Sequence, residues 1–285
     1  EGTEGAARAE LLELLASLRG GPLEDAAGYC RAVEALAELD DQNQALWQRL
    51  AEARLAVDDA PGAVAAFERS EALTEILGER TELTLRRAGL LMDPLEQFEA
   101  AMPILREVFE SSAPERQIKV AFEGLVSICR QTDAFAVLAS LYAERIGEVP
   151  EGAGRVSLMV EHAGVLEDGL DDLEGATRIW RSLLEAGHEI EHCLASLERL
   201  YAKQDRWADE AEILCRRILG ADSAEHRIAL NLRVGAISVE HLNDAPGARA
   251  AWRAVLEDDP DNSSALEGLV RHGDAATVLV HGPRL

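Results

Sequence analysis

Apolar residues recur every three or four positions along most of the chain, the spacing that places them on one face of an α-helix. Residues 226–242 follow this spacing, and residues 247–260 repeat it after a short turn. Pro260 then ends the second pattern, because proline cannot continue a helix. The sequence therefore predicts two consecutive helices here. Their apolar positions are Ile228, Leu232, Gly235, Ala236, Val239 and Leu242 in the first helix, and Ala248, Trp252, Val255 and Leu256 in the second.

The turn between these helices carries a phrase that occurs twice. Residues 59–63 and 244–248 both read Asp-Ala-Pro-Gly-Ala, and an aromatic residue, Phe67 or Trp252, follows four positions later. The aspartate is expected to accept hydrogen bonds from the first N–H groups of the helix, where proline is also tolerated. We interpret glycine and alanine as small residues that let paired helices approach, and the aromatic ring as filling the wider space one turn later. No G-x-G-x-x-G or G-K-[ST] pattern accompanies the glycines, so a phosphate-binding loop is not predicted.

Related phrases between the two copies reveal an internal repeat. Gly175 precedes Gly247 by 72 residues in a similar context, and Thr132 precedes Gln204 by the same interval. The chain is therefore predicted to alternate two kinds of unit, of roughly 33 and 39 residues. The phrases at residues 59–63, 172–176 and 244–248 are assigned to the same kind.

Each unit is predicted to be a pair of antiparallel helices. Neither helix of a pair can bury its apolar stripe alone, so stacking of the pairs is expected to form the core. The predicted fold is all-α, an α-solenoid of about seven or eight helix pairs. Residues 1–20 are expected to form an N-terminal helix or cap, residues 21–272 the repeat array, and residues 273–285 a short C-terminal helix or truncated cap. Unit boundaries between residues 71 and 117 stay open.

The phrase at residues 243–269 resembles the tetratricopeptide repeat, in which Ala, an aromatic residue and Pro stand at fixed offsets. The resemblance covers residues 21–272 and is similar to long bacterial arrays with alternating unit types. It implies a right-handed superhelix that binds proteins on its concave face. Two positions depart from the pattern: His188 replaces Pro, and Glu210 replaces an apolar residue. The positions assigned to the repeat are Trp47, Ala63, Phe67, Ala176, Trp180, Tyr201, Trp207, Ala248, Trp252 and Pro260.

The charge of the chain restricts its partners. The formal net charge is -25, from 53 acidic and 28 basic residues. Such a surface repels phosphate backbones and anionic lipid headgroups, so neither nucleic-acid binding nor membrane insertion is predicted. A basic segment of a partner protein stays compatible with it.

The cysteines give no sign of a disulfide or a metal site. No C-x-x-C pair occurs, and Cys30, Cys129, Cys193 and Cys215 all fall inside apolar helical patterns. We interpret them as small buried apolar residues, which fits a reducing compartment such as the cytoplasm. No apolar run is long enough for a membrane span. The chain lacks an initiator methionine, so a removed signal peptide stays open as an alternative.

Catalysis and metal binding are not predicted. Histidine follows glutamate directly at Glu161–His162 and Glu240–His241, but metal ligands on a helix need spacings of three or four. His188 and His192 have that spacing, yet they straddle an expected helix start. Acidic pairs such as Asp171–Asp172 recur at the turns, where aspartate caps helices. We expect no cofactor, no metal and no small-molecule substrate.

Surface positions on the first helix of each pair are the remaining candidates for function. The resemblance implies that they line a concave groove, in which Arg199, Lys203 and Arg233 would bind an acidic side chain or a terminal carboxylate. The alternative interpretation of these residues is ordinary surface salt bridges. The chain is thus predicted to be a non-enzymatic scaffold that binds a protein or peptide, or alternatively a regulatory or substrate-recruiting segment of a larger enzyme or signalling protein. The candidate partner-binding residues are Glu123, Arg130, Glu161, His192, Arg199, Lys203, Arg233, Glu240 and His241.

Overall fold

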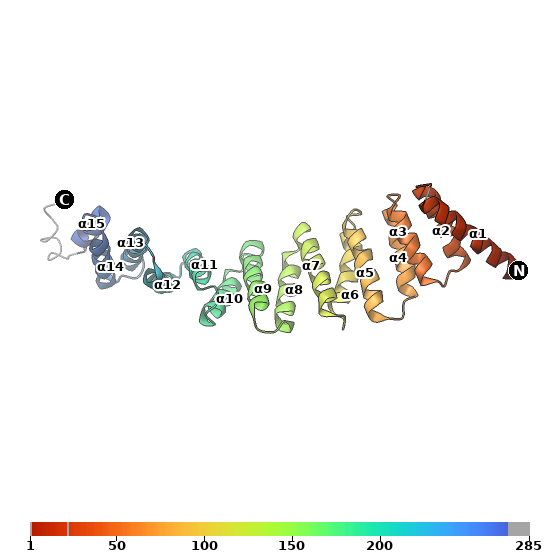
Figure 1. Cartoon of the computed structure of the whole chain (residues 1–285). Helices are drawn as coiled ribbons and strands as arrows, with labels where there is room; N and C mark the ends of the chain where they lie inside the picture. The colour runs from red at the N-terminus through yellow and green to blue at the C-terminus, as the bar shows by residue number, and fades with distance from the viewer. Residues whose placement is uncertain (1, 22, 273–285) are drawn as a thin grey trace. The chain divides into compact units, whose positions relative to one another are not determined.

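The computed structural model describes residues 2–21 and 23–272, and this part of the chain is entirely helical (Figure 1). The prediction of an all-α fold is confirmed. Two compact units divide the chain after Leu141, within helix α8, and each is described by itself. The tail at residues 273–285, for which a short helix or cap is predicted, lies outside the described residues.

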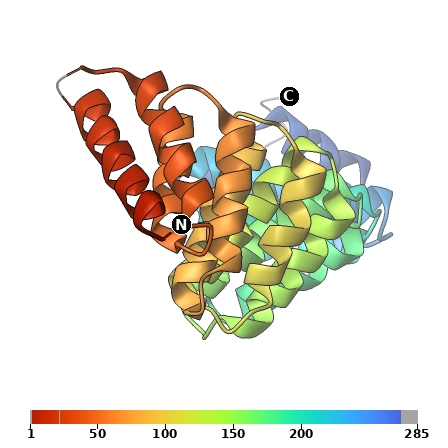
Figure 2. The ribbon, with the colours of Figure 1, turned by 90° about the vertical axis from the view of Figure 1, so that its right-hand side faces the viewer.

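Unit 1 consists of consecutive antiparallel helices, which Figure 2 shows side by side for α1 to α4. A first helix and a second helix form each pair, and α2, α4 and α6 also pack on the first helix of the next pair. The helices are α1 (Gly2–Gly20), α2 (Ala26–Leu39), α3 (Gln44–Leu55), α4 (Ala60–Ala72), α5 (Leu77–Met92), α6 (Phe98–Phe109), α7 (Glu115–Gln131) and the beginning of α8 (Phe135–Glu148).

Unit 2 continues the same order of pairs. One first helix, α9, ends in a π-helical turn, η1, before the connection to its partner. The last described helix, α15, is a first helix that packs on α14 and α13. The elements are α9 (Ala153–Gly164), η1 (Val165–Gly169), α10 (Leu173–Glu185), α11 (Ile190–Lys203), α12 (Trp207–Gly220), α13 (Ala224–Glu240), α14 (Ala245–Asp258) and α15 (Ser263–Arg271).

The turn from each first helix to its second helix has one recurring conformation. The residue before the N-cap is left-handed in each case although it is never glycine, as at Asp58, Asp171 and Asn243. Aspartate and asparagine tolerate this conformation better than other side chains do. The predicted caps are confirmed at Asp172 and Asp244, whose carboxylates accept from the N–H of the residue three positions on. In most pairs the sequence therefore has an aspartate or asparagine at the turn position that adopts the left-handed conformation.

The two alternating kinds of unit differ in the length of this turn. The N-cap N–H of the second helix bonds to a carbonyl of the first helix that lies alternately six and five residues earlier. The bonds run from Asp25 to Arg19, Asp59 to Arg54, Gln97 to Leu91, Ala134 to Cys129, Asp172 to Leu166, Arg206 to Tyr201, and Asp244 to Ser238.

This alternation corrects the assignment of the repeated phrase. Asp172 and Asp244 close the six-residue turn, whereas Asp59 closes the five-residue turn. The two identical phrases therefore belong to different kinds of unit. The reason is that five units separate them, and an odd number of units exchanges one kind for the other. The phrase encodes the cap, which both kinds share.

The glycine of the phrase has a different role from the one predicted. A Cβ atom on Gly62 would lie 2.6 Å from the Asp59 Cγ atom, and one on Gly247 would lie 2.9 Å from the Asp244 Cγ atom. Glycine is thus required because the capping carboxylate folds over it, and at Gly62 the Arg54 side chain of α3 also approaches, with its Cδ atom 2.8 Å from the same Cβ position. Close helix packing depends instead on the following alanine: Ala63, Ala176 and Ala248 are fully buried.

Aromatic side chains of the second helices lie against the first helix of the next pair. Phe67, Trp180 and Trp252 are buried, with at most 7% of each side chain exposed. Each ring also contacts a planar or cationic group of the next first helix: Phe67 lies 4.6 Å from the Arg86 guanidinium carbon, and Trp180 lies 4.6 Å from the His192 ring. These contacts connect consecutive pairs within each unit.

Candidate functional site

The nine candidate partner-binding residues are all exposed, and all lie on first helices or at their ends. Glu123 and Arg130 lie on α7 in unit 1. The other seven belong to unit 2, on α9, α11 and α13. The structure thus places the unit 2 candidates on the surface of three successive first helices: Glu161 on α9, His192, Arg199 and Lys203 on α11, and Arg233, Glu240 and His241 on α13 and at its C-cap.

Two of the candidate cations share one buried carboxylate. The Glu167 side chain, in the π-helical turn η1, is only 3% exposed and accepts from both Arg199 and Lys203. The Lys203 Nζ atom lies 2.9 Å from its Oε1 atom. Arg199 and Lys203 stay about half exposed, at 50% and 48%. Two positive charges on one carboxylate leave an unbalanced positive charge on the exposed side of α11.

The third candidate cation is held in the same way. Arg233 on α13 donates to Glu210, whose side chain is 1% exposed on α12, over an N–O distance of 2.9 Å. The other carboxylate oxygen of Glu210 is buried and has no hydrogen-bond partner. Glu210 stands four residues after the N-cap of its helix, where Ala176 and Ala248 stand in theirs. The departure from the family pattern therefore marks a buried ion pair between neighbouring helix pairs.

The Glu210–Arg233 pair should respond differently to the loss of each partner. Arg233→Met removes the cation that pairs with the buried Glu210 carboxylate, and we expect the free energy of unfolding to fall by about 1–3 kcal/mol. Glu210→Met leaves Arg233 solvated, and replacing a buried ion by an apolar side chain is often neutral or stabilising. Urea unfolding followed by far-UV circular dichroism measures both changes. Equal losses for the two variants would contradict this assignment.

Histidines cover the aromatic rings in unit 2. His241 stacks on Trp207 with ring centroids 3.8 Å apart, and His162 stacks on Tyr142 at 6.2 Å. Burial lowers the pKa of His162, an effect that Asp172 partly opposes. His192 and His272 contact Trp180 and Trp252 in tilted orientations, with ring centroids 4.6 Å and 5.5 Å apart. These histidines are packing partners of the rings.

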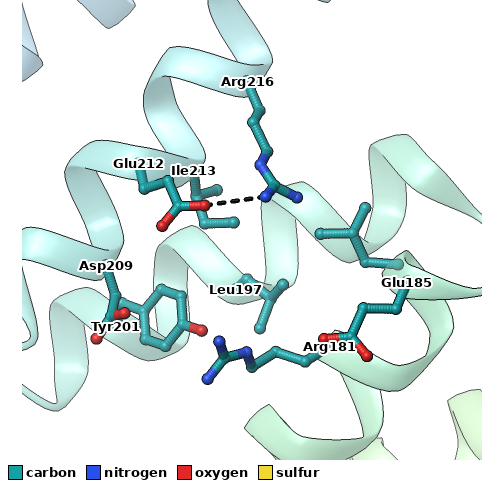
Figure 3. Close-up of a pocket in the computed structure, with 9 residues that line it drawn as sticks. Arg181, Glu185, Leu197, Tyr201, Asp209, Glu212, Ile213 and Arg216 are labelled. Atoms are coloured by element: carbon teal, nitrogen blue, oxygen red, sulfur yellow. Dashed lines mark hydrogen bonds and ion pairs between the residues drawn. The ribbon is translucent and has the colours of Figure 1, made fainter.

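A small pocket lies among α10, α11 and α12 (Figure 3). Its floor is Leu197 and Tyr201, and burial raises the pKa of the Tyr201 hydroxyl. The Arg216 guanidinium at its rim donates to Glu212 over 2.9 Å. The volume is about 80 Å³, well below the about 300–1,000 Å³ of ordinary ligand pockets.

A larger groove lies between the first helices α13 and α15. Its volume is about 350 Å³, and the Trp252 ring forms part of its lining. Glu240, a predicted partner-binding residue, stands at its edge. The sequence pattern did not point to this groove, although three of its lining residues, Leu232, Ala236 and Val239, belong to the apolar face predicted for α13.

The remaining features of the described residues concern metal binding, membrane spanning and the cysteines. Within residues 2–21 and 23–272, no group of three or more His, Cys, Asp or Glu side chains could hold a metal ion, and no helix could span a membrane. Burial raises the pKa of the Cys193 thiol to about 11, so the thiol stays protonated. Cys215 corrects the prediction of uniformly buried cysteines, because it lies on the exposed side of α12.

The antiparallel helix pairs and their recurring turn identify the fold. The chain has the fold of a tetratricopeptide-repeat array. The resemblance proposed from residues 243–269 is thus confirmed at the level of fold: seven second helices, α2 to α14, each follow a first helix within the described residues, in agreement with the predicted number of pairs.

Comparison with known proteins adds the following observations. No family model and no curated protein matches the chain. Among solved structures, the array is similar to the C-terminal part of a TPR repeat-containing protein from Cytophaga hutchinsonii, at 15% identity over 92% of this chain and 99% of that one, with a TM-score of 0.41. A tetratricopeptide repeat protein from Parabacteroides merdae has 15% identity over 93% and 99%, with a TM-score of 0.41. A structure of Naa15/Naa10 bound to HypK-THB has 15% identity over 96% and 48%, with a TM-score of 0.43.

Proposed function

We propose that this chain is a non-enzymatic scaffold that binds another protein through the exposed face of its first helices. The observation that carries the proposal is the unbalanced positive charge on α11, where Arg199 and Lys203 share the buried carboxylate of Glu167. In a chain of formal net charge -25, an exposed cationic site is a local exception. It is suited to an acidic side chain or a terminal carboxylate of a partner.

The buried carboxylates prepare this site for binding. Glu167 holds Arg199 and Lys203 in place before a partner arrives, so less side-chain entropy is lost on binding. Arg233 is held in the same way by Glu210 on the next helix pair. Each of the three cations pairs with a buried carboxylate but is about half exposed. We therefore interpret them as stabilising the fold and also accessible to a partner.

The test removes the unbalanced charge while keeping one cation on Glu167. We expect Lys203→Gln to weaken capture of an acidic partner from the native organism, read by quantitative mass spectrometry, because Arg199 alone is then neutralised by Glu167. Arg216→Gln on α12 is the matched control, because Arg216 pairs only with its helix neighbour Glu212 among the contacts described. Recovery of every partner at wild-type level with Lys203→Gln would refute the site. Changing the cations to Glu is avoided, since a second carboxylate would face Glu167.

A further inference from the structure

The groove between α13 and α15 is a second candidate binding feature on the same face of first helices. Three half-buried apolar side chains of α13, Leu232, Ala236 and Val239, line one wall, and the Trp252 ring of α14 lies between the helices. Figure 1 shows α13, α14 and α15 as consecutive neighbours. The volume of about 350 Å³ falls in the range of small-ligand pockets, about 300–1,000 Å³.

Two glycines make room for the Trp252 ring beside this groove. A Cβ atom on Gly268 of α15 would lie 2.6 Å from the Trp252 Cε2 atom, and one on Gly235 of α13 would lie 2.8 Å from the same atom. Neither helix could carry a side chain there without displacing the ring. The two glycines therefore let the Trp252 ring lie between α13 and α15, where it forms part of the apolar lining of the groove.

The rim of the groove is acidic. Glu240 has a 69% exposed carboxylate, and its distance to the His241 ring is 4.0 Å. Glu267 on α15 also lines the groove, and it pairs with Arg271 over 3.2 Å. Two carboxylates against one arginine leave the rim with an excess of negative charge. A partner that places a positive charge beside an apolar side chain in the groove would complement this acidic rim.

We infer that this groove binds a peptide segment of a partner protein in which one large apolar side chain is flanked by Lys or Arg. The apolar side chain enters between Val239 and Gly268 and covers the Trp252 lining, and a flanking cation pairs with Glu240. The inference rests on the proposed scaffold function and specifies a partner chemistry that differs from the acidic group expected at Arg199 and Lys203.

Defined peptides test this chemistry. The probe is a fluorescein-labelled, C-terminally amidated peptide, Gly-Ala-Lys-Leu-Lys-Ala-Gly, and binding to the full chain is read by fluorescence anisotropy. We expect binding that falls with added salt, since the cation pairs are exposed. Replacing the central Leu of the peptide by Ala, or both Lys by Glu, should abolish measurable binding.

Two protein variants locate the site. Glu240→Lys should weaken binding of the peptide by about twofold to fivefold or more, the range for an exposed ion pair that is removed and reversed. Val239→Glu should weaken it by about tenfold by placing a charge in the apolar wall. The matched controls are Glu257→Lys on α14 and Val270→Glu on α15, which do not line the groove. Far-UV circular dichroism measures whether each variant is folded. If Val239→Glu does not fold, the peptide affinity of Glu240→Lys tests the site.

Several results would overturn the inference. These are equal binding of the Glu-flanked peptide, unchanged affinity in Glu240→Lys, or loss of binding in the control variants. Sedimentation of the wild-type chain as a dimer that Val239→Glu dissociates would identify a second copy as the occupant instead. Peptide binding that appears only after deletion of residues 273–285 would identify the tail of the chain. The result is independent of the Lys203→Gln capture, so the failure of one test leaves the other interpretable.

Discussion

Trp252→Ala is expected to cost unit 2 about 3–5 kcal/mol of folding free energy, the range for removing a large aromatic side chain from a core. Trp252 is 7% exposed and packs with Val255 and Leu256 of its own helix and with Leu266 and Leu269 of α15. Two glycines approach the ring and cannot fill the space that it leaves. The cavity will therefore persist, and the loss should lie toward the upper end of that range.

Urea unfolding followed by far-UV circular dichroism is the appropriate measurement, because it does not depend on the deleted ring. Since repeat units contact only their neighbours, we expect α14 and α15 to unfold at lower urea than the rest of unit 2. Leu219→Ala is the control, because Leu219 is 89% exposed and its loss should change stability little. A Trp252→Ala chain as stable as the wild type would show that the ring is not part of the core.

Gly235→Ala is expected to destabilise unit 2 by about 1–3 kcal/mol, although alanine is the better helix former. The added Cβ atom would overlap with the indole nitrogen of Trp252 and lie 2.9 Å from its Cδ1 atom. The ring cannot move away, because α15 also packs against it: a Cβ atom on Gly268 would lie only 2.6 Å from the Trp252 Cε2 atom. The cost is thus one of overpacking.

The sign of this effect should reverse when the ring is absent. In a Trp252→Ala background, Gly235→Ala should be stabilising by about 0.5–1 kcal/mol, the helix propensity difference between Gly and Ala. Gly164→Ala is the matched control in the wild-type chain, since a Cβ atom there would meet nothing within 4 Å. The same destabilisation in both backgrounds, measured by a double-mutant cycle in urea, would rule out the ring as the cause.

Local signals made much of the fold predictable. Asp172 and Asp244 were recognisable as caps because aspartate three residues before glycine at a turn has few other uses. Trp180 and Trp252 were recognisable as core residues from their place after the buried alanine. The turn at Gln97 gave only a weak signal within residues 92–105, because glutamine is not a usual capping residue and its side chain makes no capping hydrogen bond there. This explains why the unit boundaries between residues 71 and 117 stayed open.

The sequence pattern predicted one buried apolar face of α13 but not a second buried face. Ile228, Leu232 and Val239 do pack toward α14 and α15, as expected. Leu230 and Ile237, on the other side, are more deeply buried and pack against α12. A one-sided apolar stripe is the rule for a surface helix, whereas a helix inside a repeat array is covered by both neighbouring pairs.

The binding surface was predictable only in outline. That Arg199, Lys203 and Arg233 lie on first helices followed from the repeat register. Their pairing with Glu167 and Glu210 did not, because it depends on which side chains of one unit reach the next. Glu210 alone gave a signal, as an acidic residue at a position where four other pairs carry alanine: Ala63, Ala101, Ala176 and Ala248. Glu167 gave none, since its burial follows from the π-helical turn.

The distribution of indole rings also determines how the chain can be observed. Of its four tryptophans, Trp180, Trp207 and Trp252 lie in unit 2, and only Trp47 lies in unit 1. Intrinsic fluorescence will therefore report mainly the unfolding of unit 2, whereas circular dichroism reports the helices of both units. A difference between the two curves would show directly, without any label, that the halves of the chain melt separately.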